Sequence, residues 1–155
     1  MSFTTGITDR SAIDLVNKTS KGYINISDWS RIYANGLYLN GLFNTFLGVT
    51  IPWTTISTPT YTTDGTAAMF NTLLTNIKNL WSYYGLTITG IIEPKTDYIG
   101  GPGSVAPTYI DINNWETDLA LLYAFILVAN KARQPRTGLA HCGASLTSNN
   151  KFRGA

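Results

Sequence analysis

The sequence YINISDW at residues 23–29 returns, little altered, as YIDINNW at residues 109–115. In each copy a short run of alternating apolar and polar residues leads to a polar helix cap, and a Trp then opens an apolar helix. Internal repetition of this kind indicates the architecture of a chain even where no single residue indicates a chemical function. The sequence therefore predicts one supersecondary unit, an extended segment followed by a helix, that is used at least twice.

The composition predicts a single domain that packs among neighbours. The chain has 155 residues, which suits one domain with its own core. Charged residues make up only 13%, and the net charge of +2 from 11 basic and 9 acidic residues is too weak to attract nucleic acid. Thr, Asn and Ser must supply the solubility, and such an uncharged surface does little to keep copies apart. We therefore expect a subunit of an assembly, with itself among its partners.

The chain carries no expected export signal or membrane span. Cys142 is the only cysteine, so no disulfide forms within the chain. The first residues lack a basic region and an apolar run, so no signal peptide is expected and synthesis is placed in the cytoplasm. The most hydrophobic stretch, Leu119 to Ala129, is too short to cross a bilayer and is interpreted as a buried helix.

Periodicity predicts four helices. The first covers residues 9–19, with Thr8 as N-cap and with Ile13 and Val16 facing inward. The second starts after a Ser27 cap and frays after Asn40, because two Asn-Gly pairs interrupt it. The third follows a cap at residue 63 or 64 and runs to about residue 84. The fourth follows a cap at residue 113 or 114 and stops at Gln134-Pro135.

The remaining segments are predicted as loops and short extended pieces. Val49 to Thr63 is a Thr/Pro-rich loop with a possible edge strand at residues 53–56, and residues 86–92 are a second strand candidate. The run from Gly100 to Ser104 is a flexible break. The predicted fold is mainly α: a small helical bundle of repeated extended-segment-plus-helix units with Thr/Pro-rich loops and minor β structure. Residues 1–134 form this domain, and residues 135–155 form an extended C-terminal arm.

No motif indicates catalysis, a cofactor or a metal. His141 and Cys142 are adjacent in a polar tail, so their side chains point apart and make a poor nucleophile–base pair. The acidic residues are scattered, which does not suit glycoside hydrolysis, and several of them lie where a helix start favours an acid. The glycine-rich run ending at Ser104 lacks the Gly-Lys-Ser/Thr ending of a phosphate loop. We expect a protein that is not an enzyme.

Four tryptophans could stack on sugars or bases. Trp29, Trp81 and Trp115 occupy apolar helical positions, which favours core packing. Trp53 lies in the Thr/Pro loop instead. It is therefore the tryptophan predicted to contact a ligand or partner.

The helix starts resemble a pattern of structural proteins from tailed phages that infect Gram-positive bacteria. In that family a segment like Tyr-Leu-Asn-x-x-Asp-Leu/Trp-Asn-Arg-Ile-Glu-x-Asn recurs before helices separated by Pro/Thr loops. Here GYINISDWSRI at residues 22–32 matches, including Asp28, Trp29 and Arg31, and Asn35 follows at the matching place. Ser30 and Tyr33 depart from the pattern's Asn and Glu.

The resemblance extends to about Arg133. The second copy, YIDINNWE at residues 109–116, keeps the cap, Trp115 and Glu116 but lacks the Arg. A middle unit, PTYT at residues 59–62, leads to Phe70-Asn71 and Asn76-Ile77 and is similar to the linking repeat of the family. The resemblance implies a virion component of the tail, baseplate or fibre-attachment apparatus, and it implies no catalytic residues.

The expected function is therefore that of a non-enzymatic structural subunit that oligomerises and connects other virion proteins, without nucleic-acid or membrane binding. The alternatives are a decoration or connector protein of the head or neck, or a receptor- or glycan-binding module that contacts the host surface. The residues expected to contact partners lie in the Thr/Pro loop, on the most apolar helix and in the arm: Trp53, Leu122, Phe125, Ile126, Phe152 and Arg153.

Overall fold

A computed structural model describes residues 2–22, 24–57, 59, 66–83, 97–100 and 102–133. Over these residues the prediction of a mainly α protein is confirmed. The helices are α1 (Ala12–Val16), α2 (Ile26–Leu47), α3 (Ala67–Ser82) and α4 (Tyr109–Arg133). Predicted features at residues 86–92, 134 and 135, and in the arm at 135–155, lie outside the described residues.

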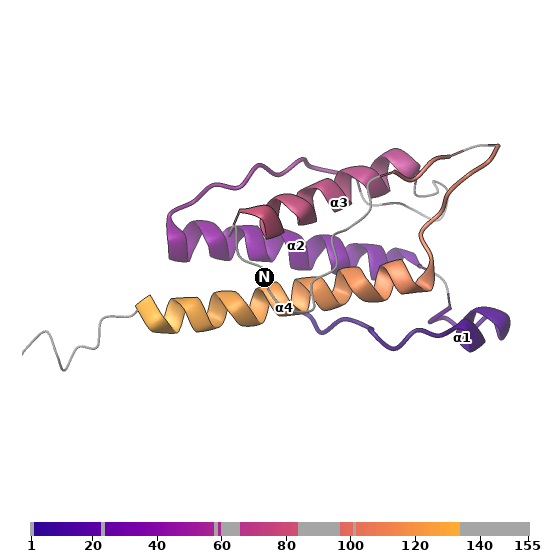
Figure 1. The fold of residues 1–155 in the computed structure, drawn as a ribbon, viewed down its shortest axis with the longest axis horizontal. Coiled ribbons are helices and arrows are strands. Elements are labelled where there is room, and N and C mark those ends of the chain that lie inside the picture. Colours follow the sequence, from indigo (N-terminus) through magenta and orange to yellow (C-terminus); the bar gives the residue numbers. More distant parts are fainter. Residues whose placement is uncertain are drawn as a thin grey trace, which may run out of the picture.

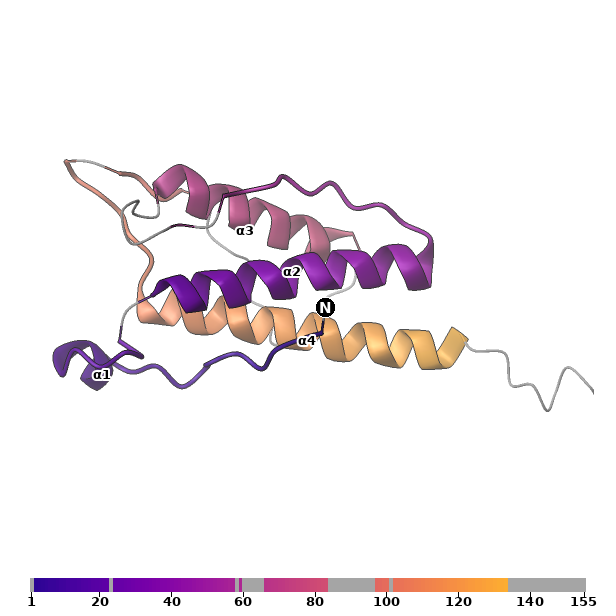
Figure 2. The same ribbon diagram turned by 180° about the vertical axis from the view of Figure 1, so that it is seen from behind.

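The three long helices lie side by side and run in the same direction (Figures 1 and 2). Near their starts, the rings of Trp29 on α2 and Phe70 on α3 are 5.0 Å apart, and near their ends Phe43 and Tyr83 are 6.2 Å apart. Parallel neighbours require the chain to return along the bundle between helices, and residues 48–57 do so in extended form between α2 and α3. Residues 2–11, which precede α1, also run along the bundle without helical structure. A small, mainly α bundle is confirmed.

The two tryptophans that open the repeats meet in the core. Trp29 and Trp115 are each 2% exposed, and both pack against the ring of Phe70, at centroid distances of 5.0 and 6.3 Å. Tyr98 adds a fourth ring, 6.1 Å from that of Trp115. This aromatic cluster ties the starts of α2, α3 and α4 together through burial and edge-to-face contact.

Helix α2 is longer and starts earlier than predicted. Asn25 is its N-cap in place of Ser27, and a capping box joins it to Asp28. The expected fraying after Asn40 is wrong, since the helix continues to Leu47 and ends on Gly48 in the left-handed conformation. The amide of Asn40 donates to the Ile51 carbonyl at 3.2 Å, so its polar side chain holds the returning segment instead of breaking the helix.

The second copy of the repeat folds differently from the first. Helix α4 begins at Tyr109, so residues 109–113 are helical, and neither Asn113 nor Asn114 is the cap. Thr108 caps the helix: its backbone N–H donates to Asp111 Oδ2 at 2.8 Å, and its hydroxyl accepts from the Asp111 N–H at 3.3 Å. Because this cap is available upstream, the helix starts before the point that the repeat alone predicts.

The other predicted boundaries also change. Helix α1 is capped by Ser11 and not by Thr8, and Ile13 and Val16 are exposed instead of facing inward. Helix α3 is capped by Thr66, and its last residue is Ser82. On either side of the glycine-rich run, Ile99 and Val105 form an isolated bridge.

Substitutions at two glycines test the packing around α1 and α2. A Cβ on Gly22 would lie 2.4 Å from the backbone oxygen of Asp14, whereas one on Gly41 would meet nothing within 4 Å. Gly22→Ala is therefore expected to lower the free energy of unfolding by about 1–3 kcal/mol. Gly41→Ala, inside helix α2, is expected to raise it by about 0.5–1 kcal/mol. Urea unfolding of both variants checks this, and equal effects would contradict the packing of α1 against Gly22.

Candidate functional site

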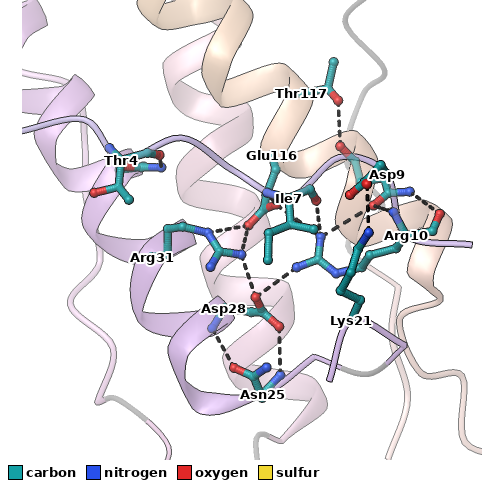
Figure 3. A network of polar contacts seen from close by, with 12 residues as sticks. Thr4, Ile7, Asp9, Arg10, Lys21, Asn25, Asp28, Arg31, Glu116 and Thr117 are labelled. Atoms are coloured by element: carbon teal, nitrogen blue, oxygen red, sulfur yellow. Dashed lines mark hydrogen bonds and ion pairs between the residues drawn. The ribbon is translucent and has the colours of Figure 1, made fainter. Parts of the chain in front are cut away.

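Four charged side chains form a closed ring where the N-terminal segment crosses α2 and α4 (Figure 3). Arg10 Nη2 lies 2.9 Å from Asp28 Oδ1, and Arg10 Nη1 lies 3.1 Å from Glu116 Oε2. Arg31 Nη2 closes the ring, at 2.5 Å from Asp28 Oδ1 and in contact with Glu116 Oε1. We call this set, Arg10, Asp28, Arg31 and Glu116, the ion-pair ring.

The ion-pair ring is almost sealed from water. The side chains of Arg10, Asp28 and Glu116 are 0–2% exposed, and that of Arg31 is 14% exposed. Two positive and two negative charges balance within it, as burial requires. Burial opposes the charge on Arg31, but the hydrogen bonds to Glu116 and Asp28 outweigh it and raise the pKa of this guanidinium.

The backbone completes the hydrogen bonding of the ring. Glu116 accepts from the N–H of Ile7, and Arg10 donates to the carbonyl of Ile7. Asp28 Oδ2 accepts from the N–H of Asn25 at 3.2 Å as part of the α2 capping box. The ring thus joins the N-terminal segment, the start of α2 and the third turn of α4. With both carboxylates held between guanidiniums in the interior, this arrangement fixes elements relative to one another.

Four asparagine side chains make the same pair of hydrogen bonds to the backbone of extended segments. Each side chain accepts from the backbone N–H and donates to the backbone C=O of one residue in an extended segment, as a neighbouring β-strand would. The pairs are Asn35 with Thr4, Asn113 with Arg10, Asn76 with Thr54 and Asn71 with Tyr98, at distances of 2.7–3.2 Å. We call these four the asparagine clamps.

The asparagine clamps explain how extended segments can lie along a parallel bundle whose described residues form no sheet. Every clamp lies on a long helix, and the four of them hold segments from residues 4–10, 54 and 98. Asn76 and Asn35 are 1% and 3% exposed, so their partners are satisfied away from water. The predicted edge strand at residues 53–56 is accordingly an extended segment held by Asn76, and it lies in no strand.

The structure brings together the motif residues that the sequence singled out. Asp28, Arg31 and Glu116 meet in the ion-pair ring, and Trp29 and Trp115 lie in the core beside it. From the sequence, Asp28 and Glu116 are expected only to be acids near helix starts and members of the motif. Arg10 was not predicted, because nothing near it in the chain shows that its partners lie 18 and 106 residues away.

The residues predicted to contact partners do not lie together, unlike the motif residues. Leu122 and Ile126 are 0% and 1% exposed, so their side chains are part of the core of the same chain, because this face of α4 packs inward. Phe125 is half-buried. Trp53 packs on α2, with its ring 5.8 Å from that of Tyr33 and over Gly36, where a Cβ would lie 2.6 Å from the indole. Phe152, Arg153, His141 and Cys142 lie outside the described residues.

The described residues give little indication of a further site for a ligand or a metal ion. A hollow of about 170 Å³ lies between the start of α3 and the Ile99–Val105 turn, and no charged side chain lines it. Tyr98 borders it, and burial raises the pKa of its hydroxyl, with the Asp111 and Asp97 carboxylates adding to the rise. Over the described ranges, no group of three or more His, Cys, Asp or Glu residues could hold a metal ion. No helix there is long and apolar enough to span a membrane.

Two carboxylates near α1, the exposed Asp9 and the half-buried Asp14, provide a pH test of this helix. Hydrogen bonds from the Ser11 and Thr19 hydroxyls hold the pKa of Asp14 below its ordinary value, and Lys21 does the same for Asp9. A lowered pKa stabilises the fold at pH above about 3.9, and this contribution is lost as the pH falls through the lowered value. Ser11→Ala is expected to raise the pKa of Asp14 in an NMR titration and to leave that of Asp9 low. A rise at both residues would show that α1 had unfolded.

No protein-family model, curated protein or solved structure matches this chain.

Proposed function

We propose that the chain is a non-enzymatic structural subunit of a phage virion, acting in the tail, baseplate or fibre-attachment apparatus as an oligomer that connects neighbouring proteins. The observation that carries the proposal is the ion-pair ring. The motif residues Asp28 and Arg31 meet Glu116 there, in the interior, and the ring joins elements distant in sequence. That use of the motif fits a rigid building block.

The polar interior supports the same function. The ion-pair ring and the asparagine clamps hold each extended segment to the helices through specific contacts. A subunit that transmits load between neighbours needs connections that keep one geometry. At the same time the described surface carries exposed apolar side chains and few charges, which favours packing against other chains.

Particle composition tests the proposal. Particles purified from a strain that carries the coding sequence are expected to contain the chain in several copies, measured by quantitative mass spectrometry. Immunogold labelling is expected to mark the tail or baseplate. Label at the head or neck would instead favour the connector alternative. Complete particles without the chain would contradict a virion role altogether.

Truncation tests the C-terminal arm. A chain that ends at Arg136 is expected to keep its helical circular dichroism and to be missing from particles, whereas the full chain is incorporated. Normal incorporation of the truncated chain would exclude the arm as an attachment element, and the particle experiment above would still test the virion role.

A further inference from the structure

Each long helix carries an asparagine at the third residue before its end: Asn44 on α2, Asn79 on α3 and Asn130 on α4. Asn44 Nδ2 donates to the Thr50 hydroxyl at 3.1 Å, and Asn79 Nδ2 donates to the Pro52 carbonyl at 3.5 Å. Both therefore contact the extended segment that follows α2. Asparagine is a weak helix former, so its use at the same place in three helices indicates a common contact.

The third of these asparagines has a different environment. Asn130 is half-buried, and the described residues give its side chain no hydrogen-bond partner. A half-buried amide is stabilised when its donor and acceptor are both satisfied. The segment that would correspond to residues 48–57 begins at residue 134, outside the described part of the chain. Because it follows α4 directly, it is the segment best placed to supply the missing contact.

Asn130 lies on the face of α4 that also receives the N-terminal segment. Tyr123, Leu127 and Asn130 are spaced by four and then three residues, so they share one face of the helix. Phe3 stacks on Tyr123, with ring centroids 4.4 Å apart, close to the start of residues 2–11. Leu127, one turn further on, is 37% exposed. The N-terminal segment therefore covers this face up to Tyr123 and leaves the last turns of α4 beyond it.

We propose that the chain that follows α4 turns back and lies in extended form along the last turns of this helix, where Asn130 holds it by hydrogen bonds. The same arrangement follows α2, whose returning segment is held by Asn44. Pro135 cannot continue a helix, which places the change of direction directly after α4. Leu139 of the returning chain then covers Leu127. The contact lies within one chain, so it goes beyond the proposed function and does not depend on it.

The returning chain has only a short distance to cover. The helix between Tyr123 and Arg133 is about 15 Å long, and an extended chain spans that distance in about five residues. Residues 136–140 are therefore enough to reach the N-terminal segment. Cys142, the only cysteine of the chain, is then placed beside Phe3.

A nitroxide spin label on Cys142 of the full chain tests the contact, because the label broadens the NMR signals of amides close to it. Strong broadening is expected at Phe3 and Tyr123. The backbone amides of residues 137–140 are also expected to exchange at least about tenfold more slowly than in a peptide of residues 134–155. Full signal intensity at Phe3 and Tyr123 would overturn the inference.

Two alanine substitutions on α4 separate a specific contact from a general change in the helix. Asn130→Ala is expected to restore the signals of Phe3 and Tyr123 and to keep the helical circular dichroism, because alanine is the better helix former. Asn114 is also half-buried on α4 and has no hydrogen-bond partner among the described residues, so Asn114→Ala is the matched control. That variant is expected to keep the broadening. Equal broadening in both variants would overturn the inference, because Asn130 would then not hold the chain.

A mixture of two forms of the chain shows which copy supplies the arm. An isotope-labelled chain with Cys142→Ser is mixed with an unlabelled chain that carries the spin label. No broadening of the isotope-labelled signals is expected, because each arm binds its own helix. Broadening between copies would overturn the contact within one chain. Particle composition is measured separately, so failure here is distinguishable from failure of the virion role.

Discussion

Arg10→Met is expected to lower the free energy of unfolding by about 3 kcal/mol or more, measured by urea denaturation. Arg10 contacts both Asp28 and Glu116, and all three side chains are buried. Removing one partner of a buried ion pair leaves an uncompensated charge, which costs about 3–5 kcal/mol. The effect is placed at the low end of that range because Arg31 still contacts both carboxylates.

A surface ion pair supplies the control for this substitution. Lys21 Nζ lies 2.7 Å from Asp9 Oδ2, with side-chain exposures of 37% and 75%. Lys21→Met removes the same kind of charge as Arg10→Met, but water screens the exposed pair. The stability of that variant is expected to match the wild type within experimental error. Equal, small effects of both substitutions would show that the ion-pair ring contributes little.

Asn76→Asp is expected to lower the free energy of unfolding by about 3 kcal/mol, although the side chain keeps its shape. The Asn76 amide donates to the Thr54 carbonyl at 2.8 Å, and a carboxylate there would face that carbonyl with a second acceptor. The side chain is 1% exposed, so water cannot relieve the contact. An unsatisfied buried group costs about 1–3 kcal/mol, and more when charged.

The neighbouring Asn79 is the matched control. It lies on the same helix and donates to the Pro52 carbonyl of the same extended segment, but across 3.5 Å and in an exposed position. Asn79→Asp is expected to change stability by less than about 0.5 kcal/mol. If the two substitutions have similar effects, the asparagine clamp at residue 76 does not hold the segment in the way described.

The sequence predicted the parts of the fold that local pattern controls. The apolar stripe of α3 is periodic, the apolar run of α4 is long, and both are helices. The α4 run was predicted to be buried, but Leu127 and Val128 within it are exposed. The repeat correctly indicated a buried Trp in each copy. It misplaced the start of α4, because Thr108 and Asp111 form a capping box that competes with the repeat.

Local sequence patterns could not predict the contacts that hold the bundle together. From its neighbours in the sequence, Arg10 is expected to be an ordinary basic residue. Four asparagines are likewise expected to be polar residues on helix surfaces: Asn35, Asn71, Asn76 and Asn113. Their roles depend on which segments pass each helix, and that is set by packing across as many as 106 residues of sequence. One signal was present: asparagine is frequent in helices here, although it is a weak helix former. An unfavourable residue used repeatedly inside helices indicates a tertiary contact.

We infer that side chains hold the extended segments to the helices and so make these segments an integral part of the bundle. Amide hydrogen exchange tests it at the backbone N–H groups that donate to these side chains, those of Thr4, Ile7, Arg10, Thr54 and Tyr98. We predict exchange at least about a hundredfold slower than in an unstructured peptide. Exchange at the unstructured rate at these amides, with the helices still protected, would contradict the claim.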